Sequence, residues 1–163
     1  MTAYDPEPWS DLFVACAGAA AALAGLVFVA VSINIEQILK SPGLPTRALA
    51  TLLLLMVAVV VSLVGLAPGQ SSTALGIEFA ALGALSAATI GVLTVRSATD
   101  EGPKGGHVFR LALSAAGTVP IAVAGISLLA ESGGGLYWAL GGLVGAVFGG
   151  VATAWVLLVE IRR

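Results

Sequence analysis

Glu78 is an ionisable residue inside an apolar stretch of this 163-residue chain, and it is the first candidate for chemistry. It lies about one to two helical turns inside the run 73–95, where a charged group costs a few kcal/mol and is a functional candidate by default. Because no Lys or Arg falls on the side of the membrane predicted for it, three states are open. The carboxyl is protonated and hydrogen-bonded, for instance to Ser127 or Tyr137, or it faces a water-filled vestibule, or it binds a cation. A protonated or simply hydrated carboxyl is the alternative to a functional site.

Ser32 and Glu36 form a polar pair at the far end of the first apolar run. They share one face if the helix continues to Lys40, as its pattern predicts before two prolines stop it. A helix from Trp9 to Lys40 would be about 48 Å long, against about 30 Å of hydrocarbon, so it would tilt or protrude. In a ring of subunits Glu36 would repeat around the axis, as acidic residues do in cation channels. The alternative is a solvated helix end, in which Glu36 pairs with Lys40.

Pro120 interrupts the run 108–129 near its middle, shortly after Thr118. Proline removes a backbone donor and clashes with the preceding turn, so we expect a kink that frees the carbonyl of Ala116. Broken helices at mid-membrane supply ion sites in transporters. The alternative is a packing kink that the Thr118 hydroxyl relieves.

The sequence contains no arrangement of residues typical of an enzyme. His107 is the only histidine and Cys16 the only cysteine, which leaves no metal set built from these residues. There is no Ser/His/Asp grouping, no phosphate-binding glycine loop and no pair of intramembrane aspartates. We therefore expect a non-enzymatic protein with no catalytic, cofactor or metal site.

Five apolar stretches must position these residues. The hydrophobic fraction is 58% and the charged fraction 10%, whereas about a quarter of the residues in globular proteins are charged. Stretches of this length and composition predict membrane-spanning helices. We expect an all-α integral membrane bundle, one domain over residues 1–163, with five transmembrane helices at about 12–33, 48–66, 73–95, 108–129 and 136–159.

Every basic residue falls on one side of this predicted bundle. Cytoplasmic loops carry the Lys and Arg excess of membrane proteins, so the pattern places the N-terminus outside and the C-terminus in the cytoplasm. With a net charge of -2, no nucleic-acid partner is expected. The bases concerned are Lys40, Arg47, Arg96, Lys104, Arg110, Arg162 and Arg163.

Small residues run in stripes along the predicted helices 12–33, 73–95 and 136–159, so these three helices can approach closely. Bulky residues surround the predicted helix 48–66, which we expect to face lipid. Ordinary packing within the chain is one explanation of the stripes. The run 136–159, however, has two adjacent glycine rows, more small surface than one neighbour needs, which favours a subunit interface in a homo-oligomer. The interface candidates are Gly18, Gly25, Gly141, Gly145, Gly149, Gly142 and Gly150.

The run DLFVACAGAAAALAGLVFVAVSIN at 11–34, together with LAPGQSS at 66–72, resembles a set of uncharacterised small multi-pass membrane proteins of actinobacteria. The resemblance covers most of the chain. It implies a bacterial plasma membrane, and it implies no function and no site.

Three functions are open at this stage. A homo-oligomeric pore with a preference for cations comes first, because one five-span unit is too small to enclose a pathway and several copies would have to meet around an axis. An alternative is a structural or accessory subunit that binds a larger membrane complex through its small-residue faces. The third is a protein that binds or handles membrane lipid.

Overall fold

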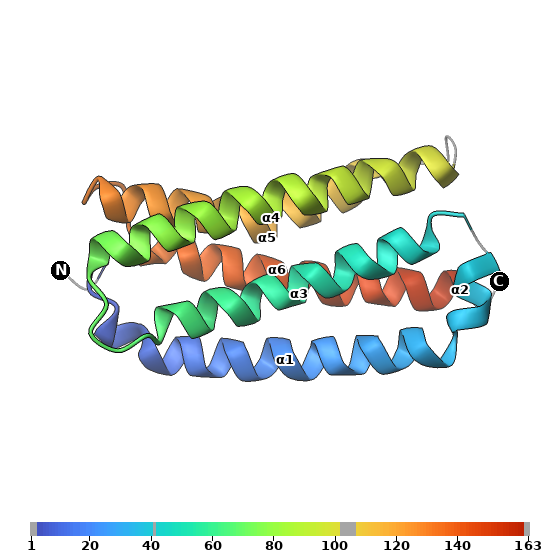
Figure 1. The fold of residues 1–163 in the computed structure, drawn as a ribbon, viewed down its shortest axis with the longest axis horizontal. Helices are drawn as coiled ribbons and strands as arrows, with labels where there is room; N and C mark the ends of the chain where they lie inside the picture. Colours follow the sequence, from blue (N-terminus) through green and yellow to red (C-terminus); the bar gives the residue numbers. More distant parts are fainter. Residues whose placement is uncertain (1–2, 41, 102–106, 162–163) are drawn as a thin grey trace.

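The computed structural model describes residues 3–40, 42–101 and 107–161, which form helices and no strand. Five long helices follow one another in alternating directions along one bundle (Figure 1). All five are long and apolar enough to cross a membrane, which confirms the predicted all-α bundle of five transmembrane helices. The elements are the 3-10 helix η1 (Glu7–Trp9), α1 (Ser10–Ile33), α2 (Ile35–Lys40), α3 (Leu44–Gly65), α4 (Ser72–Glu101), α5 (His107–Leu129) and α6 (Leu136–Ile161).

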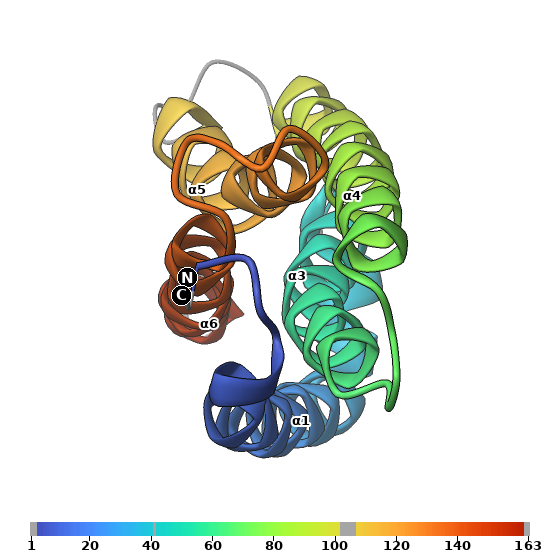
Figure 2. The same ribbon diagram turned by 90° about the vertical axis from the view of Figure 1, so that its left-hand side faces the viewer.

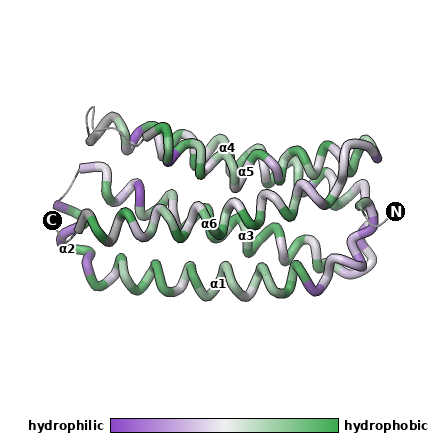
Figure 3. The backbone as a smooth tube through the Cα atoms, turned by 180° about the vertical axis from the view of Figure 1, so that it is seen from behind, coloured by the Kyte–Doolittle hydropathy of each residue, from purple (hydrophilic) through white to green (hydrophobic). Residues whose placement is uncertain are grey.

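The two ends of the bundle differ in charge. We call the end that carries α2 the basic end, because Lys40, Arg47, Arg96 and Arg110 all lie toward it. The opposite end, where α1 begins, is called the acidic end. Hydrophobic residues run along the helices between the ends, and hydrophilic ones gather at both (Figure 3). Lys104, Arg162 and Arg163 lie outside the described residues, and the assignment of the basic end to the cytoplasm stays a prediction.

The predicted continuous helix from Trp9 to Lys40 is wrong, because it breaks at Asn34. This residue has φ -106° and ψ 16°, outside the helical range, and its Nδ2 donates to the carbonyl of Ala30 at 2.8 Å. An Asn side chain can compete with the backbone for hydrogen bonds in this way and so favours a helix end. Beyond the break, α2 turns onto the start of α3 and buries Ile38, which is 1% exposed.

Helix α3 packs against three other helices, so the prediction that residues 48–66 face lipid holds for one side of the helix only. On that side Leu49, Met56 and Leu63 are 48%, 44% and 57% exposed. The other sides pack against α1, α4 and α6 (Figure 2). Leu54, Leu55 and Val61 are at most 1% exposed. A helix with apolar residues on every side fits a buried position as well as a lipid-facing one. Here the bulky side chains fill the space between helices that carry many small residues.

Helices α4 and α5 form the closest pair in the molecule, and glycines make this approach possible. A Cβ added to Gly125 would lie 2.1 Å from the nitrogen of Ala80, and one added to Gly83 would lie 2.3 Å from the nitrogen of Ala122. The two backbones are therefore in direct contact. Small residues allow such an approach in lipid, where van der Waals contact drives helix association.

The segment before α1 ties the acidic end together. The nitrogen of Leu136, at the start of α6, donates to the carbonyl of Ala3 at 2.8 Å. Trp9 meets Tyr137 edge to face, with ring centroids 4.9 Å apart. Because α1 has few other contacts with α6, this segment holds the first and last long helices together (Figure 2).

Candidate functional site

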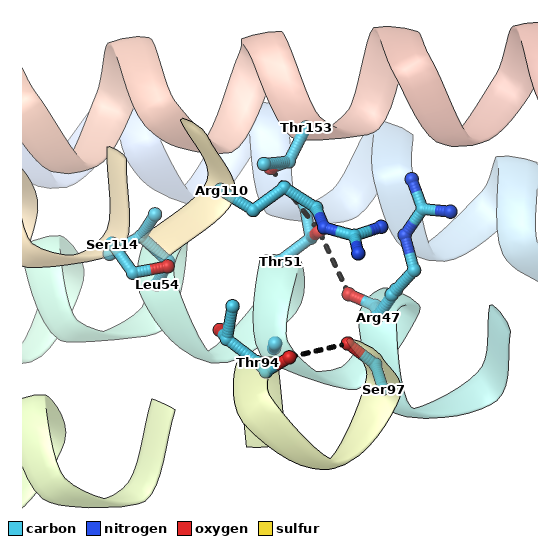
Figure 4. Close-up of a pocket in the computed structure, with 9 residues that line it drawn as sticks. Arg47, Thr51, Leu54, Thr94, Ser97, Arg110, Ser114 and Thr153 are labelled. Carbon is cyan, nitrogen blue, oxygen red and sulfur yellow. Dashed lines mark hydrogen bonds between the residues drawn. The ribbon is translucent and has the colours of Figure 1, made fainter. Parts of the chain in front are cut away.

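A polar cavity lies inside the basic end of the bundle. It has a volume of about 20 Å³, and α3, α4, α5 and α6 all contribute to its wall (Figure 4). Two arginines and five hydroxyl side chains stand out in this lining, in a bundle whose interior is otherwise largely apolar. The lining residues are Arg47, Ala50, Thr51, Leu54, Thr94, Ser97, Arg110, Ser114 and Thr153.

The two arginines reach the cavity from equivalent places in their helices. Arg47 is the fourth residue of α3 and Arg110 the fourth residue of α5. At 1.5 Å per residue, each lies about 5 Å from the start of its helix, a depth that matches the headgroup layer of a bilayer. Arg47 is 7% exposed, whereas Arg96 and Lys40 at the same end are exposed. Arg110 is half-buried, so both cavity arginines are more enclosed than Arg96 and Lys40.

The hydroxyl groups of the lining are oriented by their own helices. Thr51 Oγ1 donates to the carbonyl of Arg47 at 2.9 Å, and Thr94 Oγ1 donates to that of Ile90 at 2.8 Å. Thr51 also lies 3.3 Å from Thr153, Oγ1 to Oγ1, which links α3 to α6. A hydroxyl has one proton and two lone pairs, so each keeps acceptor capacity after donating to the backbone. These oxygens suit the N–H groups of a guanidinium.

The chemistry of the lining is that of an anion site. Guanidinium groups bind carboxylate and phosphate oxygens through two parallel hydrogen bonds, and such charge-assisted bonds are stronger than neutral ones. Arg47 and Arg110 also have other partners, and the five N–H groups of each guanidinium allow it to serve several at once. Among the described residues that line the cavity, none is acidic. A volume of about 20 Å³ holds about one water, so one oxygen of a larger anion would enter and the rest would lie at the mouth.

Glu78 has a different partner from those expected. It is half-buried in α4, and the Nε2 of Gln70, just before that helix, donates to its Oε2. Ser127 is occupied elsewhere, since its Oγ accepts from the nitrogen of Gly135 at 2.8 Å and donates to the carbonyl of Ser132. In the part of the chain that the structure describes, no three His, Cys, Asp or Glu side chains are grouped as for a metal ion.

Ser32 and Glu36 are not brought together on one helical face. The break at Asn34 puts Ser32 in α1 and Glu36 in α2, and both are exposed. The Ser32 hydroxyl donates to the carbonyl of Phe28 at 2.8 Å. Neither residue lines the polar cavity.

Pro120 lies within α5, and the carbonyl expected to be freed by it is covered by α6. Thr118 Oγ1 donates to the carbonyl of Ser114 at 2.9 Å. A Cβ added to Gly145 would lie 2.4 Å from the oxygen of Ala116, so Gly145 packs directly on that carbonyl. The turn before Pro120 thus packs against α6, and the carbonyl of Ala116 is not available to bind an ion.

The predicted interface glycines divide into two groups. Four lie at contacts within the chain: an added Cβ would come within 3.2 Å of α5 or α3 at Gly142, Gly145, Gly149 and Gly150. These four glycines of α6 therefore pack against α5 and α3 of the same chain. An added Cβ would meet nothing within 4 Å at Gly18, Gly25 and Gly141.

The sequence contains a signal for the polar cavity besides the charge asymmetry. Arg47 and Arg110 are each followed four residues later by a hydroxyl, in RALAT and RLALS. Residues four apart share a helix face, so each arginine and its hydroxyl point the same way. Two helices with this pattern at the same depth predict a shared polar site.

No protein-family model, curated protein or solved structure matches this chain.

Proposed function

We propose that this chain is a non-enzymatic multi-pass protein of a bacterial plasma membrane that binds a phosphate group in the polar cavity. The observation that carries the proposal is the convergence of two arginines and five hydroxyls, from four helices, on one cavity. Basic residues gathered between transmembrane helices at headgroup depth are suited to phosphate groups.

The position of the cavity favours a ligand from the cytoplasmic side. If the basic end is cytoplasmic, as the Lys and Arg asymmetry predicts, the cavity lies at the level of the inner headgroups. Basic pockets between transmembrane helices on that side bind phosphorylated headgroups. A soluble phosphate compound and a phospholipid headgroup offer the same oxygens, and either could supply the ligand.

Replacing one arginine tests the proposal. We expect Arg110→Gln and Arg47→Gln to weaken phosphate binding about tenfold to a hundredfold, because each charge-assisted hydrogen bond contributes about 1.5–3 kcal/mol. Arg96→Gln is the matched control, since Arg96 is exposed at the same end and does not line the cavity. Binding is measured by calorimetry with inorganic phosphate, and by native mass spectrometry with phosphatidylglycerol against phosphatidylcholine.

The two probes separate the sources of the ligand. Binding of inorganic phosphate that depends on Arg110 indicates a soluble ligand. Arg110-dependent binding of phosphatidylglycerol, without measurable binding of inorganic phosphate, indicates a headgroup. Equal behaviour of Arg110→Gln and Arg96→Gln with both probes would rule out the cavity as the binding site.

A self-associating pore is the second candidate, and one observation favours it. Gly18, Gly25 and Ser32 repeat every seven residues along α1, and all three are exposed. A second copy packed on this face would bring Ser32 close to the shared axis, where a polar side chain could line a pore.

Oligomeric state and ion flux test this second candidate. We expect Gly18→Leu with Gly25→Leu to convert an oligomer to monomers in mild detergent, while Ala81→Leu, at an exposed site on α4, has no such effect. Reconstituted liposomes should then lose cation flux. A wild-type protein that is monomeric and passes no ions contradicts the pore, and co-purification with a larger complex would indicate an accessory subunit.

A further inference from the structure

We infer that α2 is an interfacial helix, which lies in the headgroup layer of the basic-end leaflet and contacts membrane lipid with its apolar side. The bundle covers this apolar side only in part. Ile38 is 1% exposed, whereas Ile35 and Leu39 on the same side are 43% and 68% exposed. The position of α2 follows from the membrane-spanning bundle and does not depend on phosphate binding in the polar cavity.

The six residues of α2 divide into an apolar and a polar side. Successive residues of an α-helix are about 100° apart, so Ile35, Ile38 and Leu39 fall within an arc of about 100°. A helix with one apolar and one charged, polar side is suited to the plane between headgroups and acyl chains. The polar side of α2 consists of three exposed residues, Glu36, Gln37 and Lys40.

Helix α2 crosses the basic end of the bundle from α1 to α3 and does not extend α1 (Figure 1). Its six residues are about 9 Å long, which matches the about 8–10 Å between the axes of packed helices. The chain turns at Asn34 before α2, and it turns again after α2 at Gly43, whose φ of 81° is left-handed. The axis of α2 is therefore roughly parallel to the plane of a membrane that the long helices cross.

The length of α1 places α2 at the depth of the headgroups. The 24 residues of α1 are about 36 Å long, whereas the hydrocarbon layer is about 30 Å thick. A helix centred in that layer extends about 3 Å beyond it at each end, into a headgroup layer about 5–8 Å thick. Helix α2 begins two residues after α1 ends and so lies in this layer.

The apolar side of α2 points toward the middle of the bundle. Ile38 lies in one apolar cluster with Val31 of α1 and Ala48 of α3. Val31 and Ala48 are about 3 Å and about 6 Å inside the ends of their helices, so these contacts lie on the membrane side of α2. Ile35 and Leu39 flank Ile38 and point the same way, toward the acyl chains around the bundle.

Lipid fits this apolar side better than a protein partner does. A stable protein interface buries about 800 Å² on each partner, far more than two partly exposed aliphatic side chains provide. The exposed apolar surface of α1 also continues into α2, since Ile33, the last residue of α1, is 77% exposed. The lipid that covers α1 can therefore cover Ile35 and Leu39 as well.

Spin labels on α2 test this inference in a bilayer. In a Cys16→Ala background, Ile35→Cys and Leu39→Cys place a label on the apolar side, and Gln37→Cys is the matched control on the polar side. All three positions are exposed in the protein, so only the membrane distinguishes them. Electron paramagnetic resonance measures collisions with oxygen, which concentrates in hydrocarbon, and with a water-soluble nickel chelate. The protein is reconstituted in vesicles of phosphatidylcholine and phosphatidylglycerol.

We expect the ratio of oxygen to nickel collisions to be several times higher at Ile35 and Leu39 than at Gln37. Equal ratios at the three positions, with frequent nickel collisions, would place α2 in water and overturn the inference. Labels at Ile35 and Leu39 that are protected from oxygen and nickel alike would reveal a protein contact in place of lipid, and would also overturn it. Either result would leave phosphate binding by the polar cavity unaffected.

Discussion

Glu78 is held by an amide, and this pairing predicts how its substitutions differ. Its Oε2 accepts from Gln70 Nε2, and the Oε1 of Gln70 is buried without a hydrogen bond. Glu78→Gln keeps a hydrogen-bonding group opposite Gln70, so we expect wild-type stability. Glu78→Leu leaves the half-buried Gln70 amide without its partner, which costs about 1–3 kcal/mol of unfolding free energy.

Unfolding in a denaturing detergent titration measures both variants, with Glu131→Gln at an exposed site of the acidic end as control. Wild-type stability of Glu78→Gln, combined with loss of ion flux or of lipid binding, would instead identify the negative charge as functional. Equal destabilisation by Gln and Leu would contradict the pairing described here.

The chemistry of individual residues was only partly predictable from sequence. Hydropathy singled out Glu78 because its charge lies within an apolar run, but its partner Gln70 belongs to a connecting segment whose path depends on the packing of α3 and α4. Arg47 lies close enough to a helix end to be taken for an ordinary interfacial base. Only the fold shows that α3 carries it into the bundle, 7% exposed.

Among the helices, the glycines between α4 and α5 predict the most sensitive positions. Gly125→Ala places a Cβ 2.1 Å from the nitrogen of Ala80, and backbone cannot yield as a flexible side chain can. We expect a loss of about 1–3 kcal/mol of unfolding free energy, the usual cost of overpacking. Gly91→Ala is the matched control on α4, because a Cβ there meets nothing within 4 Å.

The control should be neutral or slightly stabilising, since alanine is the better helix former by about 1 kcal/mol. Detergent titration of both variants, followed by helical circular dichroism, gives the comparison. A Gly125→Ala protein as stable as Gly91→Ala would show that α4 and α5 are further apart than described.

The positions of the helices along the chain were predictable from sequence, because a bilayer requires long apolar helices. The span Val108–Leu129 agrees with the predicted 108–129 at both ends, because a bilayer requires about 20 apolar residues in a helix. The neighbours of each helix were not predictable in this way. Apolar side chains look the same against lipid and against protein, so hydropathy could not show which sides of α3 are buried. Nor could it reveal that Asn34 ends α1.

At the scale of the whole molecule, the difference between the two ends determines which leaflet supplies the ligand. The polar cavity lies at the basic end, so binding of an inner-leaflet headgroup or of a cytoplasmic phosphate requires that the basic end be cytoplasmic. The Lys and Arg asymmetry predicts this orientation. The single native thiol, Cys16, can be replaced by alanine, which leaves a background for site-specific labelling.

A cysteine placed at an exposed position of each end then reports which side of the membrane that end faces. In this background we expect Glu7→Cys, at the acidic end, to react with a membrane-impermeant maleimide in intact cells, and Lys40→Cys, at the basic end, to react only after the membrane is opened. The opposite labelling pattern would reverse the topology. The cavity would then face the outer leaflet, and lipid added from outside would reach Arg47 and Arg110 in intact cells.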